Sequence, residues 1–178
     1  MTYVMVDVES DGPVPGLYSM VSFGAVIVEP ELDRTFYAEL HPISDQWMAE
    51  SLAVCKFTRE QTLEFEEPKP VLERFEQWIE QETRSRRIFI SDNNGFDWGF
   101  INWYFWNFLG RNPFGYYSAN LGSLYKGMVR NVFESPKELL GDVHYTHNAL
   151  DDAVMNAQAL LKMKEDGLEI QLGGKSRS

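Results

Sequence analysis

Two acidic side chains near the start of the sequence have the spacing of a metal site. Asp7 and Glu9 lie two residues apart in an apolar segment, so both carboxylates leave the same face of a predicted strand. Two carboxylates side by side in an apolar setting repel each other unless a cation is bound. Mg²⁺ and Mn²⁺ prefer such oxygen ligands, so the pair indicates a divalent metal site. The alternative is a strand end whose acids face water.

A third carboxylate, Asp97, follows the apolar segment 86–91 and a short loop, at the predicted first turn of an aromatic helix. An acid in that position often caps the helix or interacts with its dipole. The end of a sheet strand is also where α/β proteins gather functional groups. Asp97 is therefore a further candidate metal ligand, and the alternative is that it only caps the helix or interacts with its dipole.

The segment HNALDD, residues 147–152, places a histidine and two acids at the predicted start of the last helix. Asp151 falls on a polar helical stripe that we expect to face solvent. Asp152 shares its stripe with Ala159, Leu160 and Met163, which border the predicted core. We therefore expect Asp152 to point toward the sheet. A lone histidine such as His147 is more often an ordinary boundary residue.

Together these residues could form a metal-dependent catalytic site. The carboxylates come from a strand, a helix start and the final helix, and a histidine flanks the last of them. Two divalent ions about 4 Å apart can clamp a phosphate, one activating water and the other stabilising the leaving oxygen. The set therefore predicts metal-dependent cleavage of a phosphodiester.

The elements that must position these residues follow from the hydrophobic pattern. Residues 2–9, 20–29 and 34–41 are predicted strands of an antiparallel meander. Two short helices are expected between residues 45 and 63. The remaining predicted elements are a strand at 86–91 and helices at 70–83, 97–110, 120–130 and 149–167. This order predicts a single α/β domain with a mixed sheet flanked by helices.

Composition limits the class of protein. The 178 residues fit one domain, and a single cysteine, Cys55, excludes an internal disulfide framework and suits a reducing cytoplasm. The N-terminus lacks the basic start of a signal peptide, and the sequence contains no apolar stretch long enough to cross a bilayer. A net charge of −11 disfavours broad binding to nucleic-acid backbones, although bound cations can supply positive charge locally.

The three motif segments resemble the signature blocks of the DEDDh group of 3′→5′ exonucleases. D-V-E-S-D-G at 7–12, followed by G-A-V at 24–26, resembles the family's D-x-E-T-T-G block and its G-A-V strand. S-D-N-N-G-F-D-W-G-F-I at 91–101 resembles A-H-N-A-x-F-D-x-x-F-L, and H-N-A-L-D-D-A at 147–153 resembles H-x-A-x-x-D-A. The departures from the family pattern are Ser10, Asp11, Ser22 and Asp92, and none of them removes a metal ligand.

This resemblance implies a ribonuclease-H-like fold and an exonuclease domain over residues 1–172, followed by a polar tail at 173–178. It implies that two Mg²⁺ or Mn²⁺ ions are held by Asp7, Glu9, Asp97 and Asp152. It further implies that His147 is the general base. The substrate would be the 3′ end of RNA or DNA, single-stranded or overhanging, and the products 5′-nucleoside monophosphates. A looser similarity to small bacterial and phage enzymes slightly favours RNA.

Two other interpretations compete with this one. A binding module could keep the fold and lose catalysis, but such a member would be expected to lose at least one of the five catalytic positions. A related phosphodiesterase or phosphatase could act on small nucleotides instead of strands. Cleavage of a 20-mer, a dinucleotide and a monophosphate ester distinguishes these interpretations.

The segment 98–108 is aromatic on nearly every face of its predicted helix. Neighbouring helices of the same domain could cover these side chains, or an exposed tryptophan could stack on a nucleotide base. We favour a two-fold dimer in which this segment contributes to the interface, because aromatic residues are enriched at interfaces.

Overall fold

The computed structural model describes residues 1–84, 86–141 and 146–172, so the predicted tail at 173–178 lies outside the described residues. In chain order its elements are β1 (Thr2–Ser10), β2 (Met20–Ile27), β3 (Thr35–Glu39), α1 (Ala49–Val54), α2 (Arg59–Thr62), α3 (Pro68–Glu82), β4 (Arg87–Ser91), α4 (Asn94–Leu109), β5 (Ser118–Asn120), α5 (Leu121–Val129), the 3-10 helix η1 (Pro136–Leu140) and α6 (Ala149–Glu165).

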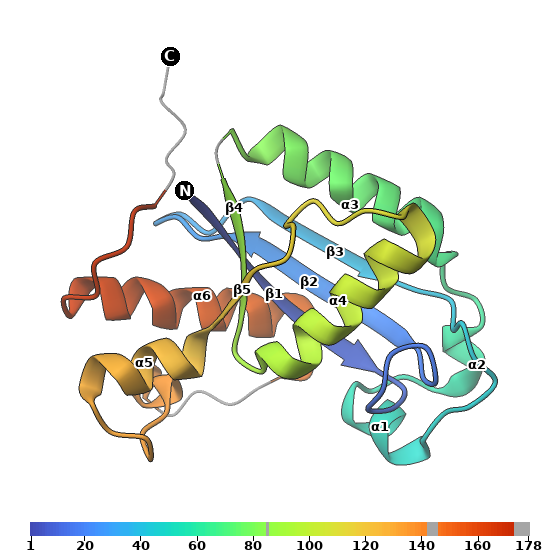
Figure 1. The fold of residues 1–178 in the computed structure, drawn as a ribbon. Coiled ribbons are helices and arrows are strands. Elements are labelled where there is room, and N and C mark those ends of the chain that lie inside the picture. The colour runs from blue at the N-terminus through green and yellow to red at the C-terminus, as the bar shows by residue number, and fades with distance from the viewer. Residues whose placement is uncertain (85, 142–145, 173–178) are drawn as a thin grey trace.

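The strands form one mixed sheet in the order β3-β2-β1-β4-β5 (Figure 1). The first three strands pair antiparallel, whereas β4 is parallel to β1 and β5 is parallel to β4. This confirms the predicted meander and the mixed α/β class. The hydrophobic pattern does not indicate β5, because its three residues, Ser-Ala-Asn, are too few and too polar for an alternating pattern.

Each face of the sheet has its own hydrophobic core. Val4, Val6 and Val8 of β1 belong to the core under α3 and α4, and Met5 belongs to the core under α5 and α6. Side chains two residues apart share a face of a strand, so Asp7 and Glu9 lie on the α6 face. The prediction that these two acids share one face is confirmed.

A glycine lets α6 lie directly on the sheet beside Asp7. Gly24 of β2 pairs with Asp7 in the antiparallel ladder. A Cβ atom at Gly24 would lie 2.3 Å from Cα of Leu150, in the first turn of α6. The absence of a side chain at this position therefore brings the start of α6 next to the carboxylates of β1.

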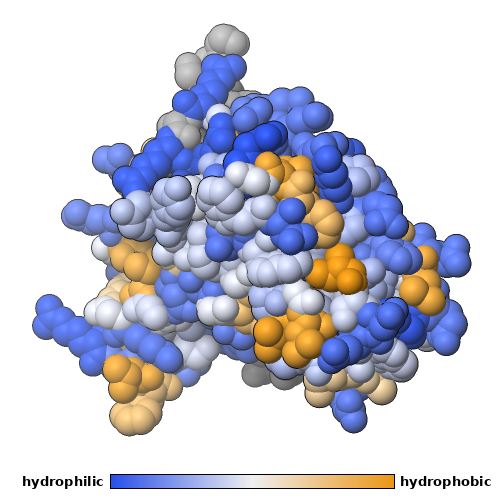
Figure 2. All heavy atoms as spheres, turned by 45° about the vertical axis from the view of Figure 1, so that its right-hand side comes forward, coloured by the Kyte–Doolittle hydropathy of each residue, from blue (hydrophilic) through white to orange (hydrophobic). Residues whose placement is uncertain are grey.

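Most of the aromatic helix α4 is covered within the chain. It begins at Asn94, three residues before the predicted start, and its buried residues are Asp97, Phe100, Ile101, Tyr104 and Phe105. Trp98, Trp103 and Phe108 are partly buried against the same core, whereas Trp106 is 43% exposed. On the face drawn in Figure 2, hydrophobic residues form small, separate patches among hydrophilic ones. Packing inside the domain thus accounts for most of the aromatic residues.

In the part of the chain that the structure describes, no helix combines the length and the apolar character needed to cross a membrane.

Candidate active site

All five predicted site residues line one cleft, where the end of β1 meets the first turns of α4 and α6. The cleft has a volume of about 310 Å³. Its lining residues are Asp7, Val8, Glu9, Asp92, Asn93, Phe96, Asp97, His147 and Asp152. Segments that are distant in the sequence therefore bring the four predicted carboxylates and the histidine together in one place.

The two acids of α6 differ as the helical pattern predicts. Asp152 is buried and lines the cleft, whereas Asp151 is exposed. Oδ1 of Asp152 accepts hydrogen bonds from the backbone N–H and the hydroxyl of Thr146, at 2.8 and 3.2 Å. Oδ2 accepts one from the backbone N–H of His147 at 2.9 Å. The carboxylate thus fixes the turn that leads into α6.

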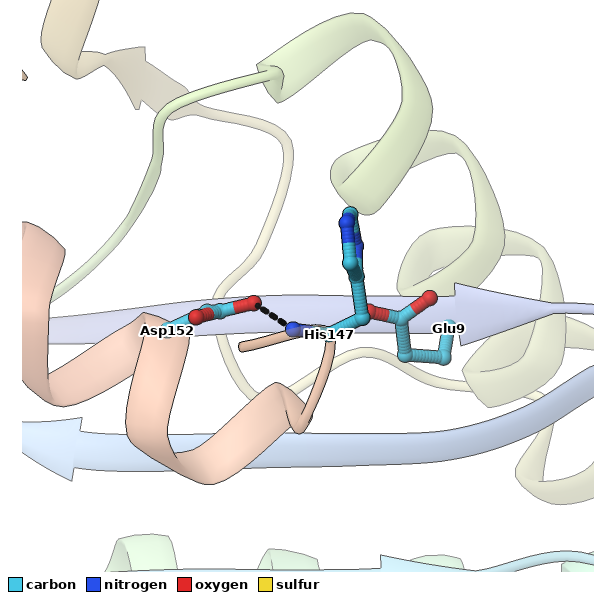
Figure 3. A group of neighbouring side chains, drawn as sticks. All are labelled: Glu9, His147 and Asp152. Carbon is cyan, nitrogen blue, oxygen red and sulfur yellow. Dashed lines mark hydrogen bonds between the residues drawn. The ribbon is translucent and has the colours of Figure 1, made fainter. Parts of the chain in front are cut away.

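His147 lies at the entrance of the cleft, with its side chain exposed. Its φ of 55° is in the left-handed region, which residues other than glycine adopt uncommonly, although histidine, asparagine and aspartate do so more often than the rest. Figure 3 shows that Asp152 contacts the main chain of His147, while the imidazole ring projects away from that hydrogen bond. Potential ligand atoms of Glu9, His147 and Asp152 lie within 4.8 Å of one another, which is close enough to share a metal ion.

Asp97 is buried in the first turn of α4 and has an unpaired oxygen. The backbone N–H of Val8 donates a 3.2 Å hydrogen bond to Oδ1 of Asp97. Among the described residues, Oδ2 of Asp97 has no hydrogen-bond partner. A buried polar atom without a partner costs about 1–3 kcal/mol, which a bound cation would offset. The N-terminal position of Asp97 is confirmed, but its burial argues against a purely capping role.

The carboxylates raise one another's pKa values. Burial raises the pKa of Asp7 well above its usual range, and the charges of Asp97, Glu9 and Asp152 raise it further. Burial and the neighbouring Asp152 raise the pKa of Glu9 to about 7. Burial raises the pKa of Asp97 to about 8, against the opposing influence of the Ser91 side chain and the Val8 amide. At neutral pH this cleft therefore favours either protons or a bound cation.

Asp92 and Lys56, which the motif spacing did not assign to the site, affect it in different ways. Asp92, at the family's usual histidine position, lines the cleft, and its charge raises the pKa of both Asp7 and Asp97. Its position directly after a predicted strand was the available signal. Lys56 donates a 2.8 Å hydrogen bond from Nζ to the carbonyl oxygen of Thr146, beside His147. This long-range contact has no signature in the sequence.

The departure from the family pattern at Asp11 has a structural reason. Asp11 is buried and does not line the cleft. One of its oxygens accepts a hydrogen bond from the backbone N–H of Ser19, and the other pairs with Arg59 at 3.0 Å. Asp11 therefore holds the loop after β1 against α2.

The fold and this cleft define the class of the protein. A sequence model described as exonuclease (RNase_T) matches residues 4–160. The chain belongs to this exonuclease family.

Individual relatives agree with this assignment. The 3′-5′ DNA exonuclease Cap18 of Escherichia coli is 33% identical over 166 residues, which cover 88% of each chain. Among solved structures, the nuclease domain of 3′hExo, described as a DEDDh family member bound to rAMP, superimposes with a TM-score of 0.78 at 19% identity, covering 98% of this chain and 96% of that one. An E. coli ExoI–ssDNA complex has a TM-score of 0.69 at 15% identity, covering 93% of this chain and 41% of that one. The resemblance to DEDDh exonucleases and the ribonuclease-H-like fold are confirmed, and the chain is a hydrolytic 3′→5′ exonuclease.

Proposed function

We propose that this exonuclease releases 5′-nucleoside monophosphates from the 3′ end of a single strand or a 3′ overhang with the help of two Mg²⁺ or Mn²⁺ ions. The observation that carries the proposal is the convergence of Asp7, Glu9, Asp97 and Asp152 in one cleft with His147 at its entrance. Their raised pKa values and the unpaired Asp97 oxygen indicate that the cleft requires positive charge.

The donor set fits a hard divalent cation. Carboxylate oxygens predominate among the side chains of the cleft, and Mg²⁺ and Mn²⁺ prefer such ligands. Asp7, Glu9 and Asp152 would hold one ion, and Asp7 and Asp97 would contribute to the second. When bound, the ions would neutralise the scissile phosphate, activate the attacking water and stabilise the leaving oxygen.

The chain's own residues would orient the reactants. His147 at the cleft entrance would accept the proton of the attacking water on a ring nitrogen, as a general base. The hydrogen bonds from Thr146 and His147 to Asp152 hold this turn in place. Phe96, which lines the same cleft, offers an aromatic face to the terminal base of the strand.

The proposed preference for DNA or RNA comes from the name of the E. coli relative. The motif resemblance slightly favours RNA, whereas that relative is named a DNA exonuclease. Because that relative shares 33% of its residues over 88% of its length, we take DNA as the preferred substrate. RNA is the alternative that the assay below compares directly.

Hydrolysis of 5′-labelled 20-mers of matched DNA and RNA sequence tests this function. With Mg²⁺ or Mn²⁺, we expect a ladder that shortens from the 3′ end, release of nucleoside monophosphates and faster cleavage of DNA. A 3′-phosphate or a circular strand should resist digestion. Rapid cutting of circles would indicate an endonuclease, and activity on a dinucleotide or a monophosphate ester alone would indicate the small-nucleotide interpretation. Asp97→Asn is the inactive control.

A two-fold dimer through α4 and a cytoplasmic location stay predictions from the sequence. Since the chain itself covers most of α4, such an interface would centre on the exposed Trp106. Sedimentation at micromolar concentration tests the dimer. A particle of 20.6 kDa, the mass of one chain, would exclude it.

A further inference from the structure

A second cleft, of about 610 Å³, lies where β4 and β5 begin. We call it the β4–β5 patch and define it by Arg84, Arg86, Arg87, Tyr116 and Tyr117, which all line it. The strand β4 runs away from this patch, and Asp92 of the active-site cleft follows directly after the other end of that strand.

The charge of the patch is opposite to that of the protein. The chain carries a net charge of −11, yet the described residues lining this cleft include three arginines and no carboxylate. Arg84 and Arg86 are exposed, and Arg87 is half-buried with its Nε donating to the Thr83 hydroxyl. Among the ion pairs of the described residues, none joins these three arginines to an acid. The guanidinium groups are therefore available to an anionic ligand.

Exposed aromatic rings stand beside these charges. Tyr116 and Tyr117 are 79% and 71% exposed. The guanidinium carbon of Arg86 lies 5.9 Å from the ring centroid of Tyr117, and Trp106 stacks on Tyr116 with centroids 6.4 Å apart. Arginines interleaved with exposed aromatic rings match the alternation of phosphates and bases in a single nucleic-acid strand.

The distance between the patch and the active site suits one continuous strand. Five residue steps separate Arg87 from Asp92, which at about 3.3 Å per residue corresponds to about 16 Å. Stacked nucleotides advance about 3.4 Å each, so a stacked strand connects the two sites with roughly five nucleotides. A stacked dinucleotide or trinucleotide in the active site ends before the patch.

We propose that the β4–β5 patch binds the substrate strand upstream of its 3′ end, with the arginines on phosphates and Tyr117 stacked on a base. This rests on the proposed function, because it assigns the patch to the same substrate. The net charge of −11 repels the strand, so a local basic patch provides attraction that only longer substrates receive. The patch thereby makes the exonuclease prefer long strands over short oligomers.

The test compares Arg84→Ala/Arg86→Ala and Tyr117→Ala with the wild-type protein. The readouts are kcat and KM on a 20-mer and a 3-mer, and binding of a 3′-phosphorylated 20-mer by fluorescence anisotropy at several salt concentrations. Because these side chains are exposed, we expect unchanged thermal stability. Lys69→Ala/Lys164→Ala, which removes the same charge from exposed positions of α3 and α6, is the matched control.

We expect Tyr117→Ala to raise KM for the 20-mer about five-fold or more, since base stacking contributes about 1–3 kcal/mol. Tyr117→Phe, which keeps the ring, should restore binding. The double arginine variant should make the slope of log K against log salt less negative by about 1.4. Values of kcat, and of KM for the 3-mer, should not change.

Several outcomes would overturn the proposal. Equal KM increases for both substrate lengths, or an equal effect of the lysine control, would show that the patch makes no specific strand contact. A change in sedimentation without a change in strand binding would assign the patch to a second copy of the chain. Failure of the wild-type protein to hydrolyse either strand would instead contradict the proposed function, while the binding experiment still tests the patch.

Discussion

The backbone N–H of His147 donates a 2.9 Å hydrogen bond to the carboxylate of Asp152. The proposed general base and a proposed metal ligand therefore belong to one turn, to which Thr146 adds two further hydrogen bonds. Asp7 has a different environment, because burial and its acidic neighbours destabilise its charge. The two acids should consequently differ in their effect on stability.

Replacing either Asp7 or Asp152 by alanine should abolish turnover, but only one replacement should stabilise the metal-free protein. In a chelator, Asp7→Ala should raise Tm by roughly 2–6 °C, because it relieves carboxylate repulsion. Asp152→Ala should lower Tm, because three hydrogen bonds to the Thr146–His147 turn are lost. Calorimetry and an exonuclease assay measure both effects.

Asp151→Ala, at an exposed position, is the control and should keep most activity. If Asp151→Ala is inactive while Asp152→Ala is active, the assignment of Asp152 as the site residue on α6 is wrong.

The stability of the metal-free protein should fall as pH rises from 5 to 9. The pKa values of Glu9 and Asp97 in the folded protein are about 7 and 8, above the ordinary values of 4.5 and 3.8 for these side chains. The folded state therefore holds protons that the unfolded state releases. Their stabilising contribution is complete below pH 4 and is lost as pH rises through 7 and 8.

Denaturant unfolding in EDTA at pH 5, 7 and 9 measures this dependence. We expect the free energy of unfolding to decrease by on the order of 2–4 kcal/mol, and Mg²⁺ to restore more of it at pH 9 than at pH 5. Asp97→Asn should reduce the dependence, since it removes one titrating group. A free energy that increases steadily from pH 5 to 9 in EDTA would contradict the assigned electrostatics.

The sequence could predict which acids share a face because their spacing reports local geometry. The two-residue period of β1 places Asp7 and Glu9 together, and the helical period of α6 separates Asp151 from Asp152. Contacts between distant segments have no such period. The hydrogen bond from Lys56 to Thr146, 90 residues away, depends on packing that no local pattern records.

The sequence of the aromatic segment also could not show how much of α4 the chain itself covers. Its composition is compatible with a dimer interface and with a helix covered inside the domain. The coverage depends on where α3 and the loop after α4 lie. Phe105 of α4 stacks with Phe75 of α3 and meets Phe114 beyond the helix end. The same loop carries the exposed Tyr116 and Tyr117, whose role depends on the arginines at the start of β4.

His147→Ala should lower kcat by roughly 10²–10⁴-fold, the usual contribution of a positioned base. Mg²⁺ affinity, measured by calorimetry, should change little if the imidazole only moves protons. Potential ligand atoms of Glu9, His147 and Asp152 lie within 4.8 Å of one another. Loss of Mg²⁺ binding in His147→Ala would therefore assign His147 as a metal ligand. His147→Gly is a useful control, since glycine adopts the left-handed backbone without strain.

Gly24→Ala should impair the active site without touching a catalytic side chain. The new Cβ would lie 2.3 Å from Cα and 2.4 Å from N of Leu150, and backbone atoms cannot rotate away as a side chain can. The start of α6 must move outward, and Asp152 moves with it. We expect a loss of about 1–3 kcal/mol in the free energy of unfolding from overpacking.

The displacement should also reduce kcat by about 10²-fold, since a shift of about 1 Å at a positioned group can have that effect. Gly127→Ala in α5 is the control, because a Cβ there meets no atom within 4 Å. That change should instead stabilise the helix by up to about 1 kcal/mol. Denaturant unfolding and single-turnover hydrolysis of a labelled 20-mer measure both effects. Unchanged kcat and unchanged stability in Gly24→Ala would show that α6 can shift along the sheet without displacing Asp152, and that close packing at Gly24 does not position the site.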